Sequence, residues 1–211
     1  MTSDKKCDIL YLEGGTEMIT ELSERISLFL CRKNIIAEEL IEVYQYGFET
    51  IISTLLGFFI TVIIGIAFRM TLLALLYYFI FVILRQFTGG YHADTYLKCN
   101  LIFAATTVFI FGMSKMAAIG DIYTIGFHML MLVFSIMVIW IKAPVENENK
   151  PLSEKQKTRN HWFSVITAMV LAVISEFLYK RAVLIAALIA FTLFVVAVMT
   201  VIATPKRKEV E

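Results

Sequence analysis

The stretch FETIISTLLGFFITVIIGIAF, residues 48–68, is almost entirely apolar and is long enough to cross a lipid bilayer as one helix. The rest of the chain has the same character, because 59% of its 211 residues are hydrophobic and its mean hydropathy is +0.76. These apolar residues come in long blocks, which are not typical of a soluble domain. The sequence therefore predicts an all-α polytopic membrane protein.

Five further apolar blocks follow the first one. The second and third blocks are short for a bilayer, which needs about 20 residues of helix, so we expect them to be tilted or to continue into polar sequence. With these two included, the chain has six predicted transmembrane helices. The later five are predicted at 71–84, 100–114, 122–141, 162–179 and 182–203.

Lysine and arginine are unevenly distributed between the two sides of such a bundle. Most of them fall in the N-terminal region, between the second and third spans, in the loop 142–161 and at the C-terminus, and six spans place all four regions on one side. Positively charged loops are enriched in the cytoplasm. We therefore expect a multi-pass protein of the bacterial cell membrane with both termini in the cytoplasm. The net charge of +1 gives no reason to expect a nucleic-acid partner.

The chain divides into three predicted parts. Residues 1–47 hold two amphipathic helices, which lie in the headgroup region or pack on the cytoplasmic mouth of the bundle, and the pattern favours neither. Residues 48–203 form the six-helix domain, and residues 204–211 form a cytoplasmic tail. Because the first ~45 residues are charged and lack a continuous apolar core, no cleavable signal peptide is expected. The apolar positions of the two amphipathic helices are Ile19, Leu22, Ile26, Phe29 and Leu30, then Ile36, Leu40, Val43, Tyr44 and Gly47.

Residues 85–99, RQFTGGYHADTYLKC, form a polar segment between the second and third spans. They place one of the three histidines, His92, and one of the three cysteines, Cys99, at a membrane boundary. Polar residues are costly there and usually functional, and a thiol beside an imidazole is typical of a cysteine nucleophile with its base. The cysteines at 7, 31 and 99 have no paired spacing, which argues against a disulfide framework or a zinc site.

The spacing of His92 and Cys99 requires a bend. Seven residues along a straight helix would separate the two by roughly 10 Å, which is too far for a hydrogen bond. Gly89 and Gly90 permit a sharp turn that would bring the imidazole back over the thiol. We therefore expect a turn at 88–95 and then a helix from about Tyr96, whose N-terminal dipole would favour a thiolate.

Simpler interpretations stand beside this one. Taken singly, a cysteine at a membrane edge is more often an inert small hydrophobe, and a histidine there is more often an interfacial hydrogen-bonding residue. The polar segment contains no serine for a Ser/His/Asp site, and its His92, Asp94 and Cys99 match no spacing of metal ligands. Its TGGY run, residues 88–91, is only weakly similar to a potassium-channel filter.

Two other polar residues in the spans have a structural interpretation. His128 is predicted to hydrogen-bond a neighbouring helix. Glu176 lies four residues before Lys180, so an ion pair within one helix explains it.

The polar segment resembles the accessory gene regulator B (AgrB) family of membrane peptidases, which process quorum-sensing propeptides. The resemblance rests on the mutual spacing of Arg85, Gly90, His92 and Cys99. It is supported by KAPV at 142–145, by NKP at 149–151 and by the hydrophobic layout from about residue 17 to residue 206.

This resemblance implies a role for each matching residue. Cys99 matches the nucleophile and His92 matches the residue that activates it. Arg85 and Gly90 match positions of less defined role, where Arg85 could bind a substrate carboxylate or carbonyl and Gly90, like Gly89, could shape the turn. Two side chains could orient His92, and the sequence does not choose between them: Asp94 and Asn100.

The implied reaction is acyl transfer. Cys99 would attack a carbonyl near the C-terminal end of an AgrD-type propeptide and release its tail, and a side chain of the peptide would then close a thiolactone or lactone ring. Backbone amides at the start of the helix near Tyr96 are the candidate oxyanion donors. The basic loop at 142–159 could attract an acidic propeptide tail, or it could serve only to set the topology.

The expected activity is that of a membrane cysteine endopeptidase in quorum sensing, with an AgrD-type propeptide and the lipid bilayer as partners, a homodimer as a candidate assembly and no cofactor. Two other classes stay open. One is a small-solute transporter or channel with a re-entrant polar segment, although few polar residues line the spans. The other is a membrane protein that recruits the propeptide without cutting it.

Overall fold

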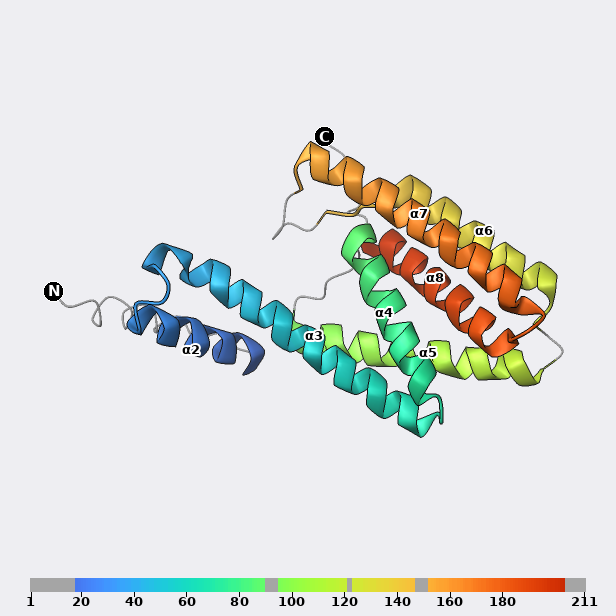
Figure 1. Ribbon diagram of the computed structural model, residues 1–211, viewed down its shortest axis with the longest axis horizontal. Coiled ribbons are helices and arrows are strands. Elements are labelled where there is room, and N and C mark those ends of the chain that lie inside the picture. Colours follow the sequence, from blue (N-terminus) through green and yellow to red (C-terminus); the bar gives the residue numbers. More distant parts are fainter. Residues whose placement is uncertain (1–17, 90–94, 121–122, 147–151, 204–211) are drawn as a thin grey trace, which may run out of the picture. The chain divides into compact units, whose positions relative to one another are not determined.

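The computed structural model describes residues 18–89, 95–120, 123–146 and 152–203, and most of them are helical (Figure 1). Six helices in these ranges are long and apolar enough to cross a membrane, and none of the described residues forms a strand. The predicted all-α fold with six spans is therefore confirmed, and the chain is a multi-pass membrane protein. The elements are α2 (Met18–Arg32), the short 3-10 helix η2 (Glu38–Leu40), α3 (Ile41–Ala67), α4 (Thr71–Thr88), α5 (Tyr96–Ile119), α6 (Ile125–Lys142), α7 (Glu154–Tyr179) and α8 (Val183–Ala203).

The two spans that looked short are full-length helices. α4 continues past the apolar block through Arg85 to Thr88, and α5 begins at Tyr96, before the apolar block of the third span. Polar side chains in a terminal turn do not stop a helix, because long ones extend toward the headgroups while the backbone stays helical. The polar segment 85–99 therefore supplies the last turn of α4 and the first turn of α5.

The second amphipathic stretch does not form a helix of its own. Its residues form η2 and then the first turns of α3, which continues without a break into the first span. The stretch contains no proline to stop the helix, and Gly47 alone is too weak a breaker. The predicted boundary at residue 47 thus lies inside a continuous helix.

The chain forms two compact units, each of which has its own packing. The first unit comprises the described residues up to Ile60 and a second stretch, 95–103, which includes the start of α5. In this unit, α2 packs against the turn before α3 through buried Leu28 and Cys31 on α2 and Ile36 and Ile41 beyond it. Part of the apolar face of α2 therefore has a partner within the chain.

The core of the second unit is α8. This unit comprises the described residues of 61–92 and 104–211, and in it α8 lies among α4, α6 and α7 (Figure 1). α8 has no charged residue, and most of it is buried. Small side chains let neighbouring helices approach closely in a membrane protein. Four such residues on α8 are completely buried: Ala186, Ala187, Ala190 and Ala197.

The end of α3 and the start of α4 approach each other at Gly65. A Cβ atom at this position would lie 2.5 Å from the Cβ atom of Ala74, and the backbone N–H of Met70 donates to the carbonyl of Gly65 at 2.7 Å. The turn between the helices is tight, with Arg69 in the left-handed region at φ 53°. The α3–α4 hairpin therefore requires glycine at position 65.

Replacing Gly65 by alanine should destabilise the protein, because the new methyl group overlaps Ala74 and the helices must separate. We expect a lower midpoint in thermal unfolding of the detergent-solubilised protein, with a cost of about 1–3 kcal/mol. Gly47→Ala is the matched control on the same helix, since a Cβ atom there meets nothing within 4 Å. Equal midpoints for the two variants would contradict the close packing.

Candidate functional site

Cys99 lies in the first turn of α5, and Thr95 caps that turn. The amide of Lys98 donates to Thr95 Oγ1 at 3.3 Å, and the amide of Cys99 donates to the Thr95 carbonyl at 3.0 Å. A threonine at this position satisfies amides that a helix start otherwise leaves without partners. The helix thus begins at the predicted residue, and the thiol is held near its positive end.

The thiol of Cys99 is free and half-buried. In the same turn Tyr96 and Asn100 are also half-buried, whereas Leu97 and Lys98 are exposed. Residues three and four apart share one side of a helix. Tyr96, Cys99 and Asn100 therefore line the inward side of α5 together.

A carboxylate from α3 contacts this side of α5 within the first unit. The hydroxyl of Tyr96 donates to Glu49 Oε2 at 2.7 Å, and Gln45 Nε2 donates to Glu49 Oε1 at 3.4 Å. Glu49 was not among the predicted site residues. The available signal was a single acid near the start of the first apolar span, where an ionisable group is costly and commonly functional.

Arg85 belongs to the second unit, in the last turn of α4. Its Nη1 atom lies 3.3 Å from the sulfur of Met199 on α8, and its guanidinium lies 5.8 Å from the centre of the Phe81 ring. These contacts hold the guanidinium at the end of the second unit that carries Thr88, which we call the Thr88 end.

Gly89 ends α4 against the loop that follows α6. Its φ is +67°, and a Cβ atom at this position would lie 2.2 Å from the carbonyl oxygen of Val145. The amide of Val145 donates to the carbonyl of Thr88 at 2.9 Å. Only glycine suits both this backbone conformation and this close approach. The helix break that the glycine pair led us to expect begins here.

The same loop is also attached to α7. His161 Nδ1 lies 2.8 Å from the Ala143 carbonyl oxygen, and Lys157 Nζ lies 3.1 Å from Glu146 Oε1. Two segments that carry the family resemblance, the end of α4 and the KAPV run, are thus hydrogen-bonded neighbours.

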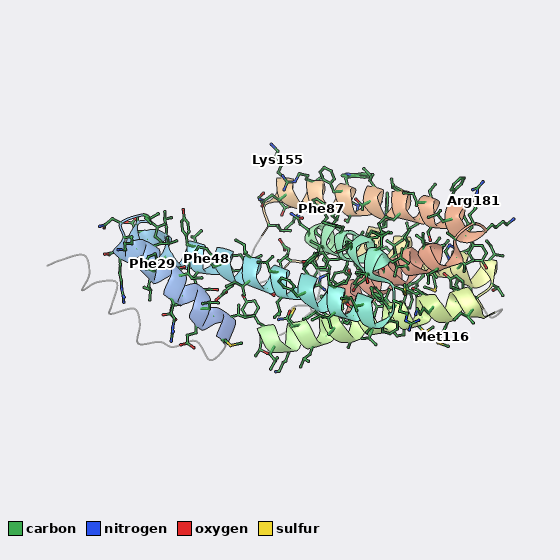
Figure 2. The ribbon with its side chains drawn as sticks, turned by 60° about the horizontal axis from the view of Figure 1, so that its bottom comes forward. Phe29, Phe48, Phe87, Met116, Lys155 and Arg181 are labelled. Atoms are coloured by element: carbon green, nitrogen blue, oxygen red, sulfur yellow. The ribbon has the colours of Figure 1, made fainter. Side chains whose placement is uncertain are left out.

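An aromatic pair fixes α7 beside the last turn of α4. The ring of Phe87, which projects from α4 in Figure 2, stacks on that of Phe163 with 5.2 Å between ring centres. α4, α7 and the loop after α6 therefore form one connected arrangement at the Thr88 end.

Three predicted site residues, Gly90, His92 and Asp94, lie outside the described residues. Of the others, Cys99 and Asn100 belong to the first unit, and Arg85 and Gly89 belong to the second. In the part of the chain that the structure describes, no three His, Cys, Asp or Glu side chains form a group that could hold a metal ion.

His128 forms a hydrogen-bonded network at the opposite end of the second unit. Its Nδ1 atom lies 2.6 Å from the Tyr123 hydroxyl, and its Nε2 atom lies 3.4 Å from Ser175 Oγ on α7, which donates to the Ala186 carbonyl at 2.8 Å. Burial, with a smaller effect of Tyr179, raises the pKa of Tyr123, so its hydroxyl stays protonated at neutral pH. As predicted, His128 bonds a neighbouring helix.

The prediction that Glu176 pairs with Lys180 was wrong. The Oε2 atom of Glu176 lies 3.7 Å from Nε2 of His128 on α6. Glu176 and Lys180 both belong to the described residues, and no ion pair joins these two side chains. The i,i+4 rule considers one helix alone, whereas here α6 brings an imidazole nearer than the lysine on the same helix.

The comparisons with known proteins agree with the motif. The family model described as Accessory gene regulator B matches residues 23–202. This chain belongs to the AgrB family. It is 30% identical over 122 residues to an AgrB-like protein 2 of Clostridium perfringens strain 13, which is 56% of this chain and 57% of that protein. It is 30% identical over 146 residues to an AgrB-like protein of C. perfringens strain SM101, which is 67% of this chain and 68% of that protein. No solved structure matches the chain.

Membership of the AgrB family connects the chain with quorum sensing as an accessory gene regulator protein. The family match includes both the polar segment and the loop after α6. The contacts of Gly89 with Val145 therefore join two parts of the sequence that lie inside the matched region.

Gly89→Ala should disrupt the contact between α4 and the loop after α6, because the residue has a positive φ and its new methyl group overlaps the Val145 carbonyl. We expect faster trypsin cleavage between Lys142 and Arg159 in the membrane-inserted protein. Gly126→Ala, where a Cβ atom meets nothing within 4 Å, is the control. Unchanged cleavage of the Gly89 variant would show that the loop is held by other contacts.

Proposed function

We propose that this AgrB-family protein is a membrane cysteine endopeptidase that removes the C-terminal tail of an AgrD-type propeptide. The observation that carries the proposal is the position of Cys99, half-buried in the first turn of a capped helix. The amides and dipole of a helix start favour a thiolate and an oxyanion, which are the charged species of acyl transfer. An inert structural thiol would need neither.

The reaction assigns roles to the residues of the polar segment. The thiol of Cys99 gives its proton to His92, and the resulting thiolate attacks a peptide carbonyl. When the C–N bond breaks, His92 returns the proton to the leaving amine and the tail departs. A thiol or hydroxyl of the remaining peptide then attacks the thioester, which closes a thiolactone or lactone ring and restores Cys99.

The other predicted residues have supporting roles. Arg85 binds a substrate carboxylate or carbonyl, Gly89 and Gly90 shape the connection between α4 and α5, and Asp94 or Asn100 orients His92. The oxyanion donors are amides of the first turn of α5. Because the amides of Lys98 and Cys99 already donate to Thr95, Leu97 is the candidate donor.

The charge distribution supports an orientation with the polar segment and both termini in the cytoplasm. The basic loop then faces the acidic tail of the substrate. Lys157 donates to Glu154 at 2.9 Å and lies 3.1 Å from Glu146, so its charge is compensated within the chain. Among the loop residues that the structure describes, three exposed cations are left for an acidic tail, and Lys155 projects from α7 in Figure 2. They are Lys142, Lys155 and Arg159.

Cys99→Ser and His92→Ala should each reduce propeptide cleavage by about 10³-fold or more, because nucleophile and base act as one unit. The measurement is release of the C-terminal tail from a co-expressed AgrD-type propeptide, read by mass spectrometry. Cys31→Ser is the matched control, since this thiol is also free but is buried against Ile36 and Ile41 in the first unit. Full processing by Cys99→Ser would exclude the proposed nucleophile.

A protein that only recruits the propeptide would bind it without forming a thioester. Trapping separates the two functions: the peptidase should show a mass increase on Cys99 equal to that of the truncated propeptide less one water, and hydroxylamine should remove the adduct. Binding without this adduct would favour the recruiting role.

A further inference from the structure

Glu49 is a carboxylate with hydrogen bonds to both of its oxygens, at the point where α3 enters the first apolar span. A carboxylate in a membrane-spanning helix is costly unless other groups bind it. One of its partners, Gln45, lies one turn earlier on the same helix, and the other, Tyr96, comes from the first turn of α5. The bond to Tyr96 therefore connects two helices that are far apart in the sequence.

The bond is placed where it restrains the thiol. Tyr96 precedes Cys99 by three residues, so their side chains project from one side of α5 with Cβ atoms about 5–6 Å apart. Thr95 caps the backbone of the same turn. The first turn of a helix frays unless something holds it. Thr95 holds the backbone of this turn, and the Tyr96–Glu49 bond holds its rotation relative to α3.

We infer that Glu49 is a positioning residue of the proposed peptidase: through Tyr96 it holds the first turn of α5 so that the Cys99 thiol meets the peptide carbonyl in one orientation. The inference rests on the proposed function. Glu49 does not touch the substrate and exchanges no proton with it. A displacement of about 1 Å at a reacting group can slow a reaction about 100-fold, which is why a residue one step removed from the thiol controls its reactivity.

The test compares four variants. Tyr96→Phe removes the hydroxyl, and Glu49→Leu removes the acceptor, so each should slow acyl transfer on the order of 10-fold, the usual effect of losing a hydrogen bond to a charged group. Glu49→Gln keeps an oxygen that accepts from Tyr96 and should stay within about 3-fold of the unmodified protein. The double variant Tyr96→Phe/Glu49→Leu should be no slower than the slower single variant, because both changes remove the same bond.

The kinetic signature separates positioning from substrate binding. In steady-state processing of the propeptide, kcat should fall while KM stays within about 2-fold, because the bond restrains the nucleophile rather than the peptide. Glu42→Gln and Tyr46→Phe, which change exposed side chains on the same helix, are matched controls. Three results would overturn the inference: a loss confined to KM, independent losses that add in the double variant, or a Glu49→Gln variant as slow as Glu49→Leu.

A second measurement needs neither substrate nor catalysis. Cys99 is half-buried, so alkylation by iodoacetamide reports how well the first turn of α5 is held. Alkylation should be faster in Tyr96→Phe and Glu49→Leu than in Glu49→Gln, in protein that elutes as a folded species. The two claims can fail separately. Processing of the propeptide by Cys99→Ser would contradict the proposed function, but it would leave the expected order of alkylation rates among the Tyr96 and Glu49 variants unchanged. Equal alkylation rates in all three variants would overturn the positioning role itself.

Discussion

The hydrogen bond from the Val145 amide to the Thr88 carbonyl is the interaction on which the Thr88 end of the second unit depends. It brings the loop after α6 so close to α4 that the next residue has no room for a Cβ atom, and this makes Gly89 obligatory. The loop is held in turn by His161 of α7. The place where the chain leaves α4 is therefore set by residues more than fifty positions further along the sequence.

Polar side chains in both units connect helices or cap them. Lipid offers no hydrogen bonds, so a polar group in a span is stabilised when another helix or the backbone binds it. The Tyr96 hydroxyl binds Glu49, the Thr95 hydroxyl caps α5, and His128 connects α6 with α7. Such pairs hold helices in fixed registers where apolar packing alone would let them slide or rotate.

The proposed reactivity of the Cys99 thiol depends on these contacts rather than on how deeply the thiol is buried. Cys31 is a free thiol too, but it lies in an apolar core. Cys99 lies in a capped first turn with a carboxylate-bound tyrosine on the same side of the helix. Backbone amides and a restrained rotation are what a nucleophile requires for acyl transfer, and neither is present around a buried thiol in the middle of a core.

The sequence alone determined the helical class, the number of spans and the start of α5. Hydrophobic length and helix signals are local properties, and they predict these features without knowledge of neighbours. Only the tertiary structure decided which residues meet. The partner of Glu176 is an imidazole on α6 and not Lys180, Glu49 binds Tyr96, and Gly89 packs against Val145. Each of these contacts joins separate helices or a helix and a distant loop. Their geometry depends on how whole elements pack, and no spacing within one segment contains it.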